Sequence, residues 1–131
     1  MVDFRITKQA DKDIDMILAH SLADFGNEAM LRYDALIIAA INAVAKQPTG
    51  ISRKLRRDLG QDVYQYFLVS SRNQVPGYIG RVKHPRHYVI YRIEQDGNMV
   101  AIGRVLHDTS EARNYIGQET WMANQAGQTT D

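Results

Sequence analysis

Residues 87–107, HYVIYRIEQDGNMVAIGRVLH, decide the fold. Apolar residues alternate with other residues on both sides of Asp96-Gly97, a dipeptide typical of tight hairpin turns. This pattern predicts two antiparallel strands, at residues 87–94 and 99–107, with residues 95–98 as their connection.

A third strand is predicted just upstream. Residues 62–69 are rich in aromatic and branched side chains, which suit a pleated sheet. Residues 70–86 are polar and contain Pro76, Gly77 and Gly80, so we expect a long connection there. The second half of the chain therefore predicts three consecutive antiparallel strands.

The first half has a different period. Residues 2–6 alternate and predict a short strand, whereas apolar residues recur at three- and four-residue steps through residues 7–25 and 27–46. Thr7 is suited to cap the first helix, and Gly26 to end it. Since the link between the helices is so short, we expect them to form an antiparallel hairpin.

The expected order is therefore β-α-α-β-β-β. It belongs to the α+β class, with an antiparallel sheet and the helical hairpin packed on one face. A short helix is expected at residues 111–116. The length of 131 residues fits one domain, which we place at residues 1–117, with residues 118–131 as a flexible tail.

Composition excludes several classes of protein. The chain has no cysteine, which excludes disulfides and cysteine-ligated metals. It has no apolar run long enough to cross a membrane and no apolar signal core near Met1, so we expect no membrane partner and a cytoplasmic protein.

Charge is distributed unevenly along the chain. Residues 1–45 carry a net −3, residues 46–92 a net +8 and residues 93–131 a net −4. A basic middle segment indicates an anionic partner, either nucleic acid or an acidic protein surface; a solvated basic face is the alternative. The basic residues cluster at Arg53, Lys54, Arg56 and Arg57, and again at Arg81, Lys83, Arg86 and Arg92.

Two residues of the last predicted strand carry further hypotheses. By alternation, Arg104 shares a face with Val100, Ile102 and Leu106, so its guanidinium must find a partner or an edge. We favour a structural role for Arg104, bound to helix carbonyls or a carboxylate, over contact with a target. His107, at the end of the strand, is a candidate for function or simply a surface residue.

The sequence shows none of the usual arrangements of a hydrolase. It contains no recognisable nucleophile–base pair, paired acids or phosphate-binding loop. The four histidines lack the spacing of a metal site. We therefore expect neither a metal nor a cofactor.

Several short motifs together resemble the RelE/ParE superfamily of toxins from bacterial type II toxin–antitoxin systems. They are Gly103-Arg-Val-Leu-His-Asp108, His87-Tyr-Val-Ile-Tyr-Arg92, Ala10-Asp-x-Asp-Ile14, Gln47-Pro48 and Leu55-Arg56. The resemblance spans residues 2–116 and implies the same β-α-α-β-β-β fold. RelE-like members cut messenger RNA in the ribosome, whereas ParE-like members poison DNA gyrase and are not enzymes.

This chain looks more like ParE, because of its last strand, long second helix and short helix link. The resemblance implies a toxin that inhibits DNA gyrase and is neutralised by a ParD-like antitoxin in the apolar groove between helical hairpin and sheet. Two alternatives stay open: a ribosome-dependent messenger RNA endonuclease and a non-toxic interaction module. Direct binding of nucleic acid by the toxin alone is also left open.

The candidate site residues follow from these hypotheses. For target or antitoxin binding they are Arg53, Lys54, Arg56, Arg57, Arg86, Tyr91, Arg92, Arg104 and His107. For a nuclease, the candidates for phosphate clamps and a general acid are Arg56, Arg104, His107, Arg113 and Tyr115.

Overall fold

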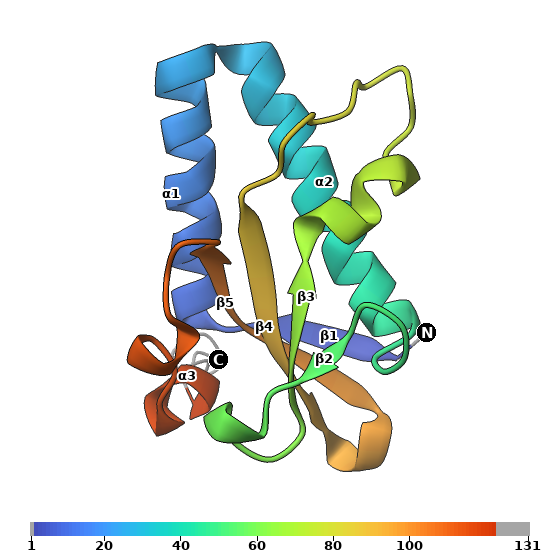
Figure 1. Cartoon of the computed structure of the whole chain (residues 1–131), viewed down its shortest axis with the longest axis vertical. Coiled ribbons are helices and arrows are strands. Elements are labelled where there is room, and N and C mark those ends of the chain that lie inside the picture. Colours follow the sequence, from blue (N-terminus) through green and yellow to red (C-terminus); the bar gives the residue numbers. More distant parts are fainter. Residues whose placement is uncertain (1, 123–131) are drawn as a thin grey trace, which may run out of the picture.

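The computed structural model describes residues 2–122 and contains a five-stranded sheet in the order β1-β5-β4-β3-β2 (Figure 1). The strands are β1 (Asp3–Ile6), β2 (Lys54–Leu55), β3 (Val63–Phe67), β4 (His87–Glu94) and β5 (Met99–His107). The predicted hairpin is confirmed, since β4 and β5 run antiparallel with His87 opposite His107. The α+β class and the expected order of the main elements are confirmed as well.

The sheet departs from the prediction at both edges. β1 runs parallel to β5, and two helices and three strands separate the two in the chain. The antiparallel arrangement therefore holds only for the strands from β5 to β2. β2 was not predicted, since a strand of two residues is too short to show alternation.

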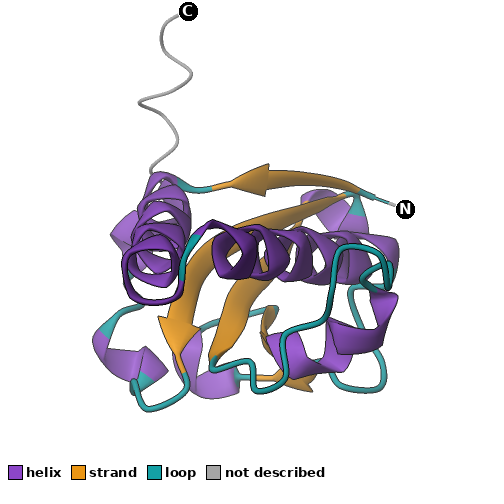
Figure 2. Ribbon diagram, turned by 90° about the horizontal axis from the view of Figure 1, so that it is seen from above, coloured by secondary structure: helices purple, strands orange, loops and turns teal. Residues whose placement is uncertain are grey.

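The helical hairpin consists of α1 (Lys8–Phe25) and α2 (Asn27–Lys46). Thr7 caps α1 as predicted, its Oγ1 accepting the N–H of Ala10 at 3.2 Å. Gly26 makes the turn with φ at 94°, a value that favours glycine. The two helices diverge from this turn on one side of the sheet (Figure 1), and in the view from above α2 runs across the strands (Figure 2).

The main core lies between the helices and the sheet. It is built from fully buried side chains that include Leu36, Ile37, Ala40, Val44, Tyr66, Val89, Tyr91, Val100 and Ile102. A second, smaller cluster covers the opposite sheet face and consists of Val63, Tyr88, Ile90, Ala101, Leu106, Ala112 and Trp121. Both faces of the sheet are therefore covered, at least in part.

A β-bulge at Gly103 interrupts β5. Tyr91 of β4 lies opposite Ile102, whereas Ile90 lies opposite Arg104, so Gly103 has no partner across the ladder. The alternation of side chains is reversed beyond this point. The expectation that Arg104 shares a face with Ile102 is therefore wrong, and the cause is the extra residue in the strand.

The long connection after β3 is partly helical. A 3₁₀ helix, η2 (Leu68–Gln74), follows β3 directly, so the strand ends at Phe67 rather than at Val69. Leu68 and Ser71 are buried against α2. The polar sequence of this stretch concealed its packing, and only residues 75–86 form an irregular connection.

Two short helices follow β5: η4 (Ala112–Asn114), in place of the longer helix expected at residues 111–116, and α3 (Gln118–Met122). Trp121 of α3 lies on the sheet face opposite the hairpin, so close that a Cβ on Gly103 would approach its ring to 2.6 Å. The folded region thus continues past residue 117 to Met122. The rest of the expected tail, residues 123–131, lies outside the described residues.

Candidate functional site

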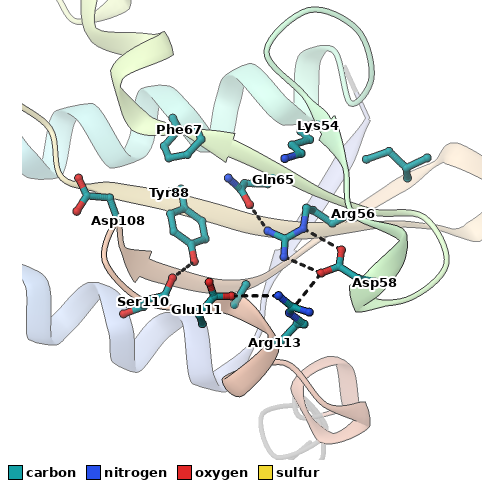
Figure 3. A pocket seen from close by; sticks show the side chains of 12 residues that line it. Lys54, Arg56, Asp58, Gln65, Phe67, Tyr88, Asp108, Ser110, Glu111 and Arg113 are labelled. Atoms are coloured by element: carbon teal, nitrogen blue, oxygen red, sulfur yellow. Dashed lines mark hydrogen bonds and ion pairs between the residues drawn. The ribbon is translucent and has the colours of Figure 1, made fainter.

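Two concave regions of the described chain lie on opposite faces of the sheet. The first, which we name the hairpin groove, lies between α1, α2 and residues 80–87, and its volume is about 970 Å³. The second, the sheet-face pocket, lies between β2, β3 and residues 108–113, and its volume is about 450 Å³ (Figure 3). β4 contributes to both, with His87 in the groove and Tyr88 in the pocket, because side chains alternate across a strand.

The sheet-face pocket is electrically balanced. Its three cationic side chains are Lys54, Arg56 and Arg113, and its three carboxylates are Asp58, Asp108 and Glu111. Figure 3 shows the arginines pointing toward the carboxylates rather than into open space. A polyanion would therefore find little net positive charge here.

Arg56 is held within this pocket. Its guanidinium donates to both carboxylate oxygens of Asp58, at 2.9 and 2.8 Å, and to the side-chain oxygen of Gln65. The hydrogen bonds from Arg56 lower the pKa of Asp58 to about 2. The guanidinium of Arg56 consequently binds side chains of its own chain rather than a partner.

Arg53 contacts the C-terminal end of α2. It donates to the carbonyls of Ala43 and Gln47, at 2.9 and 2.7 Å, and its guanidinium lies 4.8 Å from the ring centre of Tyr66. The Ala43 carbonyl also accepts the backbone N–H of Gln47, and a cation at this place adds a donor at the end of the helix and complements the helix dipole. The geometry thus gives Arg53 a structural role.

Arg104 is paired with a carboxylate, as we favoured from the sequence. It donates twice to Asp13 of α1, at 2.8 Å each, and the same carboxylate accepts the N–H of Val105 at 2.9 Å. The guanidinium also lies 5.4 Å from the ring of Tyr115. This cluster joins α1 to β5 just beyond the bulge.

Arg92 contributes to a similar cluster at the other end of the sheet. Arg5 and Arg92 both donate to Glu94, and Arg92 lies 4.7 Å from the ring of Trp121. Burial raises the pKa of Glu94, but the two arginine hydrogen bonds outweigh it and the pKa is lowered overall. These contacts hold α3 against β1 and β4.

Tyr91 and Arg86 complete the set of predicted binding residues with intramolecular contacts. Tyr91 is fully buried and donates its hydroxyl to the carbonyl of Pro48 at 2.6 Å, so its side chain is inaccessible to a partner. Arg86 is exposed but forms a two-pronged pair with Asp108, at 2.8 and 3.1 Å. In contrast, neither Lys54 nor Arg57 is seen to form an ion pair within the described residues, and both are exposed.

The five residues of the nuclease hypothesis do not form one constellation. Arg56 and Arg113 line the sheet-face pocket, whereas Arg104 and Tyr115 contact each other at the edge of β5. His107 lines the hairpin groove on the other side of the sheet. The structure thus separates the general-acid candidate His107 from the phosphate-clamp candidates Arg56 and Arg113.

The hairpin groove brings together histidines that no sequence motif connects. All four histidines of the chain line it, namely His20, His84, His87 and His107. Its apolar part includes the exposed side chains of Met16 and Phe25. Met16 lies outside the apolar stripe of α1. An apolar residue at such a position was the sequence feature that could have indicated an exposed apolar surface here.

Hydrogen bonds fix the inner wall of the groove. Tyr33 of α2 accepts the backbone N–H of Arg86 at 3.0 Å and contacts Nδ1 of His87 at 2.6 Å. The network is satisfied when Tyr33 donates to Nδ1 and His87 is neutral. Burial, followed by the neighbouring His107, lowers the pKa of His87 to about 4.

Two further findings concern metal binding and membrane-spanning helices. Within residues 2–122, no group of three or more histidine, aspartate or glutamate side chains is arranged to hold a metal ion. In the same range, neither long helix combines the length and the hydropathy that a membrane-spanning segment needs.

Comparison with known proteins identifies the family. The family model described as "ParE toxin of type II toxin-antitoxin system, parDE" matches residues 4–111. No curated protein sequence matches the chain at a significant level.

One solved structure shows the same fold, and a second is similar to a smaller degree. The chromosomal ParDE toxin–antitoxin system from P. aeruginosa aligns with a TM-score of 0.59 at 15% identity, covering 82% of this chain and 96% of that one. The toxin–antitoxin complex RelBE2 from Mycobacterium tuberculosis aligns with a TM-score of 0.48 at 20% identity, covering 81% and 96%. With a family model that spans most of its length, the chain belongs to the ParE toxin family of type II toxin–antitoxin systems.

Proposed function

We propose that this toxin inhibits DNA gyrase and is neutralised by a ParD-like antitoxin that occupies the hairpin groove. The observation that carries the proposal is the dispersal of the nuclease candidates: His107 lies across the sheet from Arg56 and Arg113. General acid–base catalysis needs its groups within hydrogen-bond reach of one substrate atom, so this dispersal favours a protein-binding toxin over a ribonuclease.

The hairpin groove supports the antitoxin part of the proposal. Its cationic side chains are Arg32, Arg81, Lys83 and Arg86, and Asp24 is its one lining carboxylate. Exposed apolar side chains lie beside them, with Phe25 at 77% and Met16 at 65% exposure. An amphipathic segment with apolar residues on one side and carboxylates on the other matches both features.

The target is assigned to a different surface. Lys54 and Arg57 are exposed beside the sheet-face pocket, on the opposite side of the sheet from the groove. Their charges are available to an acidic protein surface, in contrast to that of Arg56, which is paired with Asp58. We therefore assign gyrase contact to Lys54 and Arg57.

The test is a gyrase supercoiling and DNA-cleavage assay with the purified chain, with and without a ParD-like antitoxin. We expect inhibition with accumulation of cleaved DNA, reversed by the antitoxin. The double variant Lys54→Glu/Arg57→Glu should inhibit at least about tenfold less while its antitoxin affinity is unchanged. Arg56 is left intact, since charge reversal there would break its pair with Asp58.

The alternatives predict different results. A ribosome-dependent nuclease would leave gyrase unaffected and cut messenger RNA in a translation extract. A non-toxic interaction module would do neither and would leave growth unaffected on expression. Either pattern would overturn the gyrase assignment without changing the family.

A further inference from the structure

The turn between α2 and β2 presents an aliphatic side chain to solvent. This turn, which we name the Ile51 turn, comprises residues 47–53 and follows the end of α2 (Figure 1). Ile51 is 87% exposed, more than any other leucine, isoleucine, valine or methionine of residues 2–122. A single exposed apolar side chain is common on protein surfaces, so the contacts that hold the turn decide what it means.

Two buried tyrosines support the Ile51 turn from the core. The hydroxyl of Tyr91, a fully buried residue, donates to the carbonyl of Pro48 at 2.6 Å. Arg53 donates from its guanidinium to the carbonyl of Ile51 at 2.9 Å. That guanidinium lies 4.8 Å from the ring centre of Tyr66, which is also buried. The turn is therefore anchored to the core on both sides of Ile51.

The backbone of the turn is also restrained. The N–H of Arg53 donates to the carbonyl of Gly50 at 3.1 Å and closes the turn. Gly50 and Ser52, on either side of Ile51, have φ of 116° and 71°. A serine rarely adopts a positive φ and retains it only where surrounding contacts hold the backbone. The turn thus keeps one conformation, and in that conformation Ile51 points into solvent.

The charges that follow the turn are cationic. Lys54 and Arg57 come three and six residues after Ile51, and both are exposed. Residues 47–53 contain no carboxylate. A partner at this margin of the sheet meets an aliphatic side chain with two positive charges beside it. Apolar anchors with a charged rim contribute most of the binding energy in many protein interfaces, and a rigid turn lowers the entropy lost on binding.

We propose that Ile51 is the aliphatic anchor with which the toxin binds its target protein, entering an apolar depression bordered by carboxylates. The inference rests on the proposed function, because it extends the target surface assigned to Lys54 and Arg57. The carboxylates face these two cations, and the depression buries the side chain that the turn holds in water. Tyr91 and Arg53, expected from the sequence to bind a partner, act instead through the turn that they hold.

The experiment compares variants of the full chain in the gyrase supercoiling assay. Ile51→Ala should raise the concentration for half-inhibition about tenfold, as for truncation of an interface anchor. Ile51→Val should stay within about threefold of the native chain, because it retains most of the side chain. Ile38→Ala is the matched control, since Ile38 is an exposed isoleucine of α2 outside the target surface, and it should stay within about twofold.

Two further measurements separate target contact from other roles of Ile51. Ile51→Ala and Ile38→Ala should both give native circular dichroism and bind a ParD-like antitoxin within about twofold of the native chain. An equal loss of antitoxin affinity and of gyrase inhibition in Ile51→Ala would place Ile51 in the antitoxin interface and overturn the inference. Full inhibition by Ile51→Ala, or an equal loss in Ile38→Ala, would overturn it as well.

Growth on expression separates failure of this inference from failure of the proposed function. If the native chain inhibits gyrase and Ile51→Ala inhibits it equally, the proposed function holds and the inference fails. If the native chain stops growth without affecting gyrase, the proposed function fails. Growth restored by Ile51→Ala at equal expression then upholds the anchor at another target, whereas growth arrest by both chains overturns it. A native chain that is inert in both assays overturns both proposals.

Discussion

The hairpin groove and the sheet-face pocket lie on opposite sides of one sheet and differ in the balance of cationic and carboxylate side chains that line them. In the pocket, three cations face three carboxylates, and Arg56 donates to Asp58 and Gln65. In the groove, four cations and one carboxylate line the wall; Arg86 is paired with Asp108, and apolar side chains are left exposed beside the other cations. Counting basic residues along the sequence does not distinguish the two, because pairing in the folded chain decides which charges remain available.

The largest effect is expected on the sheet face opposite the helical hairpin, where Trp121 packs. Trp121→Ala removes a buried aromatic ring that packs on Gly103 and under Arg92. We expect the free energy of unfolding to fall by about 3 kcal/mol, toward the lower range for such truncations because α3 is terminal. Urea unfolding followed by circular dichroism measures this loss.

A control for that change is Met122→Ala, at a neighbouring exposed position, with an expected effect below about 0.5 kcal/mol. Antitoxin affinity should stay within about twofold in both variants, since the groove lies across the sheet. Weakened antitoxin binding in the tryptophan variant would show that the two surfaces are coupled.

The next effect concerns the arginines that hold the fold. Asp13→Asn removes the charge that accepts two hydrogen bonds from Arg104 and one from Val105. We expect a loss of about 2 kcal/mol, because Arg104 is left partly buried with a weaker partner. Asp15→Asn, on the exposed side of the same helix, is the matched control; equal losses in both variants would contradict the structural role of this pair.

A smaller effect is expected from pH. The pKa of His87 is lowered from the ordinary histidine value near 6.5 to about 4. Between these two pH values His87 is protonated in the unfolded chain and neutral in the folded chain. Stability therefore falls as pH decreases through this window. We expect about 1–2 kcal/mol, less than the full linkage value because His87 is partly exposed.

The variant His87→Gln isolates that contribution. Between pH 6.5 and 4.5, its unfolding free energy in urea should decrease less than that of the native chain. Parallel curves for the two proteins would show that His87 is not the source.

The smallest effects on stability are expected at two exposed cations, one on each side of the sheet, and these variants compare the binding roles of the two surfaces. Lys83→Glu in the groove and Arg57→Glu beside the sheet-face pocket both change an exposed residue, and each should alter stability by less than about 0.5 kcal/mol. Their binding effects should differ: Lys83→Glu weakens antitoxin binding about tenfold, whereas Arg57→Glu leaves it unchanged. Equal effects on antitoxin affinity would remove the distinction between the two surfaces.

Local patterns predicted the architecture well. Alternation on both sides of Asp96-Gly97 gave the β4–β5 hairpin, the helical periods gave α1 and α2, and Thr7 was identified as a cap. Each of these signals depends on residues close together in the sequence. The parallel pairing of β1 depends instead on residues far along the chain and was not predicted.

The candidate site was predicted less well, for the same reason. The pair of Arg104 with Asp13 joins positions 91 residues apart, and only its general kind was anticipated. The bulge at Gly103 reversed the expected faces with a single unpaired residue. The presence of His20 and His107 in one groove likewise depends on how α1 packs against β5, which no local motif records.

The packing of Trp121 has a consequence for how the folding of this chain is observed. It is the one tryptophan in the sequence, so intrinsic fluorescence reports the attachment of α3 to the sheet and hardly senses the helical hairpin. Far-ultraviolet ellipticity, in contrast, is dominated by α1 and α2. If the two signals change at different urea concentrations, the last helix leaves before the domain unfolds, and the chain has two cooperative units where its size suggests one.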